Sequence, residues 1–190
     1  MIAKAAGSGA GIALMLLSAC AAPRVAGGDA TASPASRLAR DMAVADAAFD
    51  AGDRAALADA VQRIERQSPR PIDGDAPDPV RRWRGALPDA APPVRGRALG
   101  PGYVRGRLAA GAARRLGPLF LSGQAATVAA NSRPQKHLRL KIFDGAGQLV
   151  CDRSPAHVRD CRFTPVFTQR YRIEIANGGA ATAHYYLVVD

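Results

Sequence analysis

The sequence predicts a mainly β protein, an antiparallel β-sandwich or jelly roll preceded by a short α-helical hairpin and a Pro/Arg-rich linker. From residue 102 onward, short apolar segments alternate with polar positions, and turn residues separate them without an intervening helix. Between residues 33 and 67 the apolar residues instead recur every three or four positions. Period two predicts strands and period 3.6 predicts helices, so the two halves of the chain differ in class.

The helical hairpin is expected over residues 33–67. Ser33 followed by Pro34 is a typical helix start, with serine as the N-cap and proline at the first helical position. Gly52 ends the first helix and Asp53 is placed to cap the second. The apolar stripes are Leu38, Met42, Ala45 and Phe49, then Leu57, Val61 and Ile64. A hairpin with such stripes packs either on the sandwich or on a partner protein.

Residues 68–101 have the composition of a linker, because prolines are concentrated there and predict extended segments. Arginines accumulate from Arg81 onward, and the only tryptophan lies among them in the run Arg81-Arg82-Trp83-Arg84. A tryptophan among arginines either lies at a lipid interface or stacks on a sugar ring, or it is a packing residue with solvated basic neighbours.

The sandwich is expected over residues 102–190, with about eight short strands. Its clearest strand spans 138–142, where leucine and isoleucine alternate with Arg139 and Lys141. Asn177-Gly178 is a strong hairpin-turn signal. The expected strands are 103–108, 119–122, 124–131, 138–142, 148–151, 158–164, 171–175 and 184–189.

The N-terminus predicts export and lipid attachment. Residues 1–19 combine Lys4, a short apolar run and small residues, as secretory signals do. Leu17-Ser18-Ala19-Cys20 resembles the lipobox of bacterial lipoproteins, which predicts that Cys20 is acylated and anchors the chain in a membrane. The alternative is an ordinary signal peptide. Residues 20–32 read as a flexible tether, and Ala21 after the cysteine suggests the outer membrane, facing the periplasm.

Two further cysteines, Cys151 and Cys161, would meet an oxidising compartment after export, which predicts a disulfide. Two free buried thiols are the alternative. Metal ligation is not expected, because His157 would supply only a third ligand and no fourth is evident.

The formal net charge of +10 predicts an acidic partner. An exported chain meets little nucleic acid, so an anionic envelope polymer, lipid phosphates or a partner protein are the expected ligands. The outward residues of the strands could continue the arginine belt of the linker on one face. The predicted binding residues are Arg81, Arg82, Trp83, Arg84, Arg139, Lys141, Arg170 and Arg172.

Three stretches of the C-terminal half resemble a known family: LFLSGQAATVAA, LRLKIFDGAGQLVC and CRFTPVFTQRYRIEIANGGAATAHYYLVV. They are similar to bacterial pre-peptidase C-terminal domains, small β-sandwiches appended to secreted enzymes or carried by envelope proteins. Some members of that family bind calcium through clustered acidic residues. Here Asp144, Asp152 and Asp160 are scattered, so no calcium and no other cofactor is expected.

No catalytic constellation is evident, because the histidines are not spaced as ligands and no serine lies in a G-x-S-x-G turn. The sequence therefore predicts a non-catalytic, membrane-anchored envelope lipoprotein whose cationic sandwich binds an anionic component. The alternative is a structural or assembly component that docks through Leu38, Met42 and Phe49 of the hairpin. An accessory role to a hydrolase is a more distant alternative.

Overall fold

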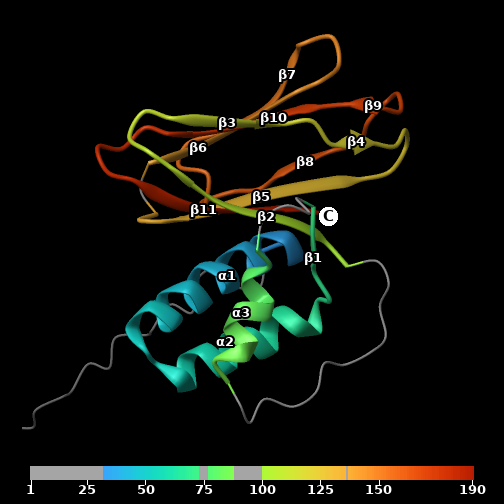
Figure 1. Ribbon diagram of the computed structural model, residues 1–190. Helices are drawn as coiled ribbons and strands as arrows, with labels where there is room; N and C mark the ends of the chain where they lie inside the picture. The colour runs from blue at the N-terminus through green and yellow to red at the C-terminus, as the bar shows by residue number, and fades with distance from the viewer. Residues whose placement is uncertain (1–31, 73–76, 88–99, 136) are drawn as a thin grey trace, which may run out of the picture. The chain divides into compact units, whose positions relative to one another are not determined.

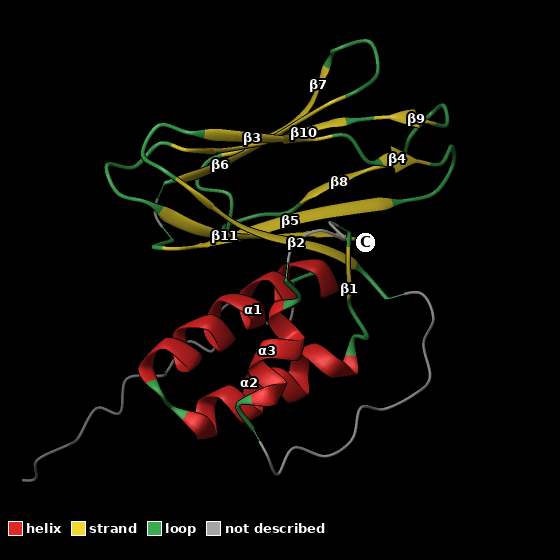
Figure 2. Ribbon diagram, viewed as in Figure 1, coloured by secondary structure: helices red, strands yellow, loops and turns green. Residues whose placement is uncertain are grey.

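The computed structural model describes residues 32–72, 77–87, 100–135 and 137–190. These residues form a helical layer, a five-stranded sheet and a four-stranded sheet, stacked in that order (Figures 1 and 2). The described chain is thus mainly β with an N-terminal helical hairpin, as the sequence predicts. The predicted signal peptide, the acylated Cys20 and nearly all of the predicted tether lie outside the described residues.

The hairpin consists of α1 (Pro34–Ala51) and α2 (Arg54–Arg66). The Ser33 side chain accepts a hydrogen bond from the backbone N–H of Ser36 and so caps α1. Gly52 ends α1 with φ +69°, a conformation that glycine adopts without strain. Asp53 caps α2 through the backbone N–H of Ala56. These caps confirm the boundaries expected from the sequence.

The interpretation of residues 68–101 as a linker is wrong for the part that the structure describes. The short strand β1 (Arg70–Pro71) pairs in parallel with β2, and α3 (Pro79–Gly85) follows. Asp78 caps α3, and the side chain of Trp83 is fully buried. So short a helix is stabilised by tertiary packing more than by its own propensity, and proline at its first position is compatible with a helix. Asp78-Pro79 has the same pattern of capping residue and proline as Ser33-Pro34, but a helix of seven residues is too short to show an apolar stripe.

The five-stranded sheet has the order β1-β2-β11-β5-β8, and the four-stranded sheet has the order β3-β10-β6-β7. All pairs other than β1–β2 are antiparallel. The strands of the first sheet beyond β1 are β2 (Gly102–Leu108), β11 (Ala183–Val189), β5 (Ala126–Arg133) and β8 (Cys161–Phe163). Those of the second are β3 (Ala113–Leu116), β10 (Arg172–Asn177), β6 (Leu138–Phe143) and β7 (Leu149–Arg153), and β4 (Leu119–Phe120) pairs with β9 (Gln169–Arg170). Of these, β1, β3 and β9 were not expected from the sequence.

Two hydrophobic cores lie on opposite faces of the five-stranded sheet. On β11, Tyr185 and Leu187 point between the sheets, while Tyr186 and Val188 pack against the helices. Leu38 and Met42 of α1 are fully buried in the helix-facing core. Leu38 and Met42 are thus covered within the protein's own fold and do not form a docking surface for a partner. Phe49, the third residue of that hypothesis, is half-buried beneath Arg82.

A disulfide joins Cys151 on β7 to Cys161 on β8, with the two Cα atoms 6.0 Å apart. It confirms the predicted pairing. Because β7 and β8 are the last strands of their respective sheets, the bond links the two sheets at one edge.

Candidate binding site at the helix–sheet junction

The helix-facing surface of the five-stranded sheet changes from apolar to basic along its strands. Antiparallel register aligns residues of β2, β11 and β5 in rows across the sheet. In the order β2, β11, β5, the rows are Tyr103, Val188 and Ala129; then Arg105, Tyr186 and Asn131; then Arg107, His184 and Arg133. The first row belongs to the core shared with the helices. We call the arginines and the histidine of the other two rows the basic end of the sheet.

Asp46 of α1 is the counter-charge to this basic end, and only 1% of its surface is exposed. Arg105 donates to one carboxylate oxygen at 2.6 Å, and Arg133 donates to the other at 3.2 Å. The Tyr186 hydroxyl also donates to Asp46, and His184 Nδ1 lies 3.4 Å from the same oxygen. A buried carboxylate with several donors ties α1 to three strands at once.

Burial alone would raise the pKa of Asp46, because desolvation disfavours the charged form. The hydrogen bond from Tyr186 and the charges of Arg105 and Arg133 outweigh burial, so the pKa of Asp46 lies below its usual value. Burial and the neighbouring carboxylate both raise the pKa of Tyr186. Asp46 is therefore ionised at neutral pH, and Tyr186 stays a neutral donor.

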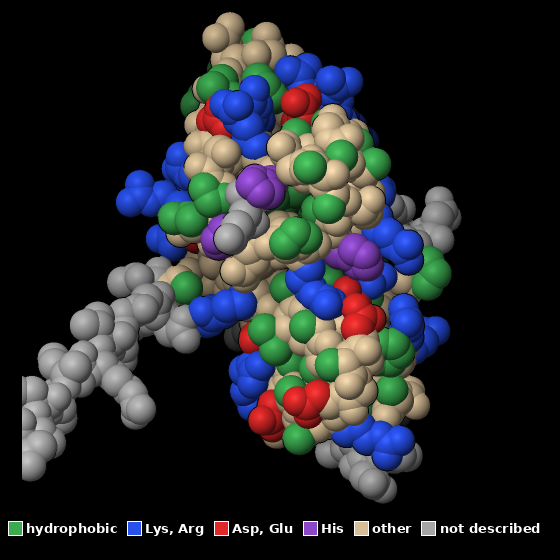
Figure 3. Space-filling model, turned by 90° about the vertical axis from the view of Figure 1, so that its left-hand side faces the viewer, with side chains coloured by type: hydrophobic (Ala, Val, Ile, Leu, Met, Phe, Trp, Pro, Cys, Tyr) green, Lys and Arg blue, Asp and Glu red, His purple; other side chains and the backbone are tan. Residues whose placement is uncertain are grey.

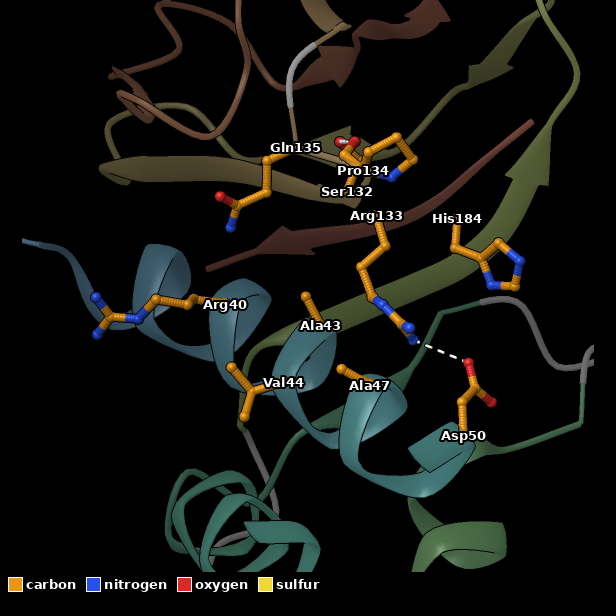
Figure 4. A pocket seen from close by; sticks show the side chains of 10 residues that line it. All are labelled: Arg40, Ala43, Val44, Ala47, Asp50, Ser132, Arg133, Pro134, Gln135 and His184. Carbon is orange, nitrogen blue, oxygen red and sulfur yellow. Dashed lines mark hydrogen bonds and ion pairs between the residues drawn. The ribbon is translucent and has the colours of Figure 1, made fainter. Parts of the chain in front are cut away.

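A hollow of about 590 Å³ lies between α1 and the ends of β5 and β11 (Figure 4). Arg133 reaches from the sheet toward Asp50 of α1, and Nη1 of Arg133 lies 3.0 Å from the Asp50 carboxylate. Ala43 and Ala47, on the same helix as Asp50, form the apolar part of the α1 wall. Because its central arginine already binds two carboxylates, this hollow offers an anion little unbalanced charge.

A second groove, of about 240 Å³, lies between α3 and β2. Three of its lining residues are arginines, Arg82 from α3 and Arg105 and Arg107 from β2, and no acidic residue is among the described residues that line it. We call this the arginine groove. Its floor includes Tyr103, whose hydroxyl donates to Asp78 at the start of α3 and so fixes the helix against the strand.

The arginines of the groove differ in how they are held. The Arg82 guanidinium stacks 4.3 Å from the centre of the Phe49 ring, and Arg105 is bound to Asp46. The Arg107 side chain is exposed and makes no hydrogen bond or ion pair within the described part of the chain. Two arginines are thus positioned in advance, while the third is available for a ligand.

The other predicted binding residues on α3 differ in exposure and in their contacts. Arg81 is exposed, and Arg84 forms an ion pair with Glu65 of α2. Trp83 is buried in the helix-facing core, so the prediction that it is a binding residue is wrong. Its ring cannot reach a lipid surface or a sugar, and the packing alternative describes it.

The expectation of one continuous basic face is also wrong. Arg139, Lys141 and Arg172 lie on the outer face of the four-stranded sheet, whereas α3 lies in the helical layer beyond the other sheet. Arg139 is paired with Asp152, and Arg172 stacks over Phe143. A row across this sheet alternates in sign and consists of Arg115, Glu174, Lys141 and Asp152.

Arg170, the remaining predicted binding residue, lies on β9 at the end of the sandwich and donates to the Gly117 carbonyl. Figure 3 shows one face of the molecule, on which basic side chains are spread widely and acidic ones lie beside some of them. Among the described residues, no group of three or more His, Cys, Asp or Glu side chains is arranged to hold a metal ion.

Comparison with known proteins gives no family for the chain. No protein-family model matches it, and no curated protein matches it. The resemblance to pre-peptidase C-terminal domains therefore stays a prediction.

Solved structures resemble about half of the chain. One is PliG from Aeromonas hydrophila, a periplasmic inhibitor of g-type lysozyme, with 11% identity and a TM-score of 0.40 over 47% of this chain and 84% of that one. PirA has 11% identity and a TM-score of 0.33 over 46% and 93%. A designed double-stranded β-helix has 12% identity and a TM-score of 0.31 over 46% and 97%. Likenesses of this strength say nothing about what the chain binds.

Sequence reasoning missed Asp46, Arg105, Arg107 and Arg133 as site residues. The alternation of Arg105 and Arg107 with apolar neighbours does place both on one face of β2. Nothing in that pattern says that the face is the one covered by helices. The charge of Asp46, within an otherwise apolar stripe of α1, was the available signal of a buried ion pair.

Proposed function

We propose that this protein is a non-catalytic envelope lipoprotein that binds an anionic envelope component through the arginine groove. The observation that carries the proposal is the meeting of Arg82, Arg105 and Arg107 in one groove without an acidic lining residue among the described ones. These arginines come from elements that are separated in the sequence by the residues 86–101, so only the fold assembles the groove.

The chemistry favours a phosphate or carboxylate group on a polymer or headgroup. Guanidinium groups bind such oxyanions through paired N–H donors, and these charge-assisted hydrogen bonds are stronger than neutral ones. Phe49 and Asp46 already restrict Arg82 and Arg105, which lowers the entropy lost on binding. The net charge of +10 supports the same choice, because it attracts acidic partners from a distance.

The membrane anchor in this proposal is the lipid on Cys20. No helix in the described part of the chain is long and apolar enough to cross a membrane. The lipobox-like Leu17-Ser18-Ala19-Cys20 would attach the chain to the outer membrane, with the sandwich in the periplasm. The disulfide between Cys151 and Cys161 is compatible with this oxidising compartment.

The test compares two double variants that lose the same charge. Arg82→Gln/Arg107→Gln removes two groove arginines, and Arg54→Gln/Arg159→Gln removes two exposed arginines elsewhere that have no described partner. Binding to inorganic polyphosphate and to phosphatidylglycerol vesicles is measured by titration over a range of salt concentrations. We expect the groove variant to lose about tenfold or more in affinity, and the control about threefold or less.

The two probes separate the possible sources of the anion. Tighter binding of polyphosphate indicates a polymer ligand, and tighter binding of the vesicles indicates a headgroup. Equal losses in the two double variants would show that net charge, not the groove, drives binding, and would overturn the proposal. Absence of measurable binding to both probes would overturn it as well.

A further inference from the structure

A cleft of about 350 Å³ lies between residues of the two sheets. Pro118 and Arg170 line it, next to or on β4 and β9, which lie at one end of the sandwich in Figure 1. Val104 and Leu187 of the five-stranded sheet form one wall, and Leu116 and Ile173 of the four-stranded sheet form the other. All of these residues belong to the sandwich core or pack against it. The cleft is therefore an unfilled extension of that core, whereas protein interiors are normally packed to high density.

The mouth of the cleft is basic. Arg114 and Arg170 line it, and no acidic side chain is among the described lining residues. Arg114 occupies an inward-facing position of β3, because its register partner on β10 is the fully buried Ile175. Inward positions of a sandwich usually hold apolar residues. Arg114 has an interaction partner of its own, whereas the Arg170 side chain is exposed at the mouth.

The surface beside the mouth is apolar and exposed. Leu119 pairs with Arg170 across the small β4–β9 sheet, and it is 55% exposed. Val166 and Phe167, in the loop just before β9, are 73% and 70% exposed. The Val166 carbonyl accepts a hydrogen bond from Ser122, which follows β4, so this loop lies against the same end of the sandwich. Exposed apolar side chains gathered in one place mark a contact surface for apolar ligands.

We propose that this cleft binds a single-chain anionic amphiphile, with the acyl chain between the sheets and the head group at the mouth beside Arg170. A cleft of this volume lies within the range of small-ligand sites, which are largely apolar with a few polar groups that fix orientation. The basic mouth selects a negative head group, and the exposed leucine, valine and phenylalanine give the chain a first contact. This site is separate from the arginine groove.

The experiment uses the full-length chain with Cys20→Ala, so that the protein carries no acyl group of its own. Displacement of the fluorescent probe 1-anilinonaphthalene-8-sulfonate is followed with dodecanoate, lysophosphatidic acid, dodecanol and dodecyltrimethylammonium, all below their micelle concentrations. We expect an anionic ligand to bind about tenfold or more tightly than the cationic one, as one charge-assisted hydrogen bond would give. Preference for dodecanoate or for lysophosphatidic acid identifies a carboxylate or a phosphate head.

Variants locate the ligand in the cleft. Leu116→Trp fills the cleft from one wall and Val189→Phe fills it from the other, so each should weaken dodecanoate binding by about tenfold or more. Arg170→Gln should weaken dodecanoate but leave dodecanol unchanged. Arg172→Gln, on the outer face of the sheet, is the matched charge control and should change neither.

Equal affinity for the cationic and anionic amphiphiles would overturn the inference, as would no displacement by any of the four. Unchanged dodecanoate binding in a cleft-filling variant with a native circular dichroism spectrum would also overturn it. Arg82→Gln/Arg107→Gln should bind dodecanoate normally, so failure of the arginine-groove proposal and failure of the cleft proposal are distinguishable.

Discussion

Replacing Asp46 with asparagine tests whether the buried carboxylate holds the helical layer on the sheet. Asparagine has nearly the same shape, so the change removes charge without creating a cavity. Arg105 would then lose its counter-charge, Arg133 would keep only the exposed Asp50 as a partner, and the Tyr186 hydroxyl would lose a charged acceptor. Each of these three groups is at least partly withdrawn from water.

The expected loss follows from burial. Removing one partner of a buried ion pair costs about 3–5 kcal/mol, because the remaining charge is left without compensation. The side chains of Arg105 and Arg133 are 24% and 32% exposed, so water can partly solvate them after the change. We therefore expect a loss near the lower limit, about 3 kcal/mol. For a chain of this size that corresponds to a decrease in Tm of about 6–12 °C.

The assay is urea unfolding at pH 7, followed by far-ultraviolet circular dichroism and by the fluorescence of Trp83. This residue is the chain's only tryptophan and is buried in the helix-facing core, so it reports on the layer that Asp46 holds. Asp59→Asn on the exposed side of α2 is the control and should change stability by less than about 0.5 kcal/mol. A loss below about 1 kcal/mol for Asp46→Asn would refute the reasoning.

The same carboxylate predicts the pH dependence of stability. The pKa of Asp46 is lower in the folded state than in the unfolded state. The stability that Asp46 contributes is therefore fully present above its unfolded pKa of about 3.9, and it is lost as pH falls through its folded pKa. The pKa of Asp152 is lowered too, chiefly by Arg139. The free energy of unfolding should fall below about pH 4, less steeply in Asp46→Asn. Parallel pH profiles for the two proteins would contradict this assignment.

Further predictions concern the packing of the helical layer, the disulfide and the anchor. Trp83→Ala should lower stability by about 3–5 kcal/mol because it empties a fully buried site in the core, and a near-native Tm would show that α3 does not depend on this residue. Replacing Cys151 and Cys161 with serine should lower the free energy of unfolding by roughly 3 kcal/mol, as expected for closure of a short loop, and thiol labelling of the unreduced wild-type protein should find neither cysteine reactive. Cys20→Ala should move the protein from the membrane fraction to the soluble periplasmic fraction, and unchanged membrane retention would disprove acylation at this residue.

The hairpin and the main strands were predictable because their signals are local. Ser33, Gly52 and Asp53 cap helix ends through contacts within about one turn of backbone. The alternation from Leu138 to Ile142 requires only that one face of the strand is buried and the other is exposed to solvent. The disulfide was predictable from the compartment and the number of cysteines. Local signals fail for Trp83. Its arginine neighbours in the sequence predict an exposed position, whereas α1 and the sheet bury its side chain in the folded chain.

By itself, the sequence determined the class of the hairpin and of the main strands, their caps and turns, the excess of positive charge and the pairing of Cys151 with Cys161. Only the tertiary structure decided which face of each strand meets the helices, and hence that Arg105 and Arg107 line a groove with Arg82 while Arg139 and Lys141 lie on the far sheet. The physical reason is the distance along the chain over which each signal acts. Periodicity and capping depend on residues a few positions apart, whereas a binding site depends on distances between elements that the chain brings together only when it buries its two cores.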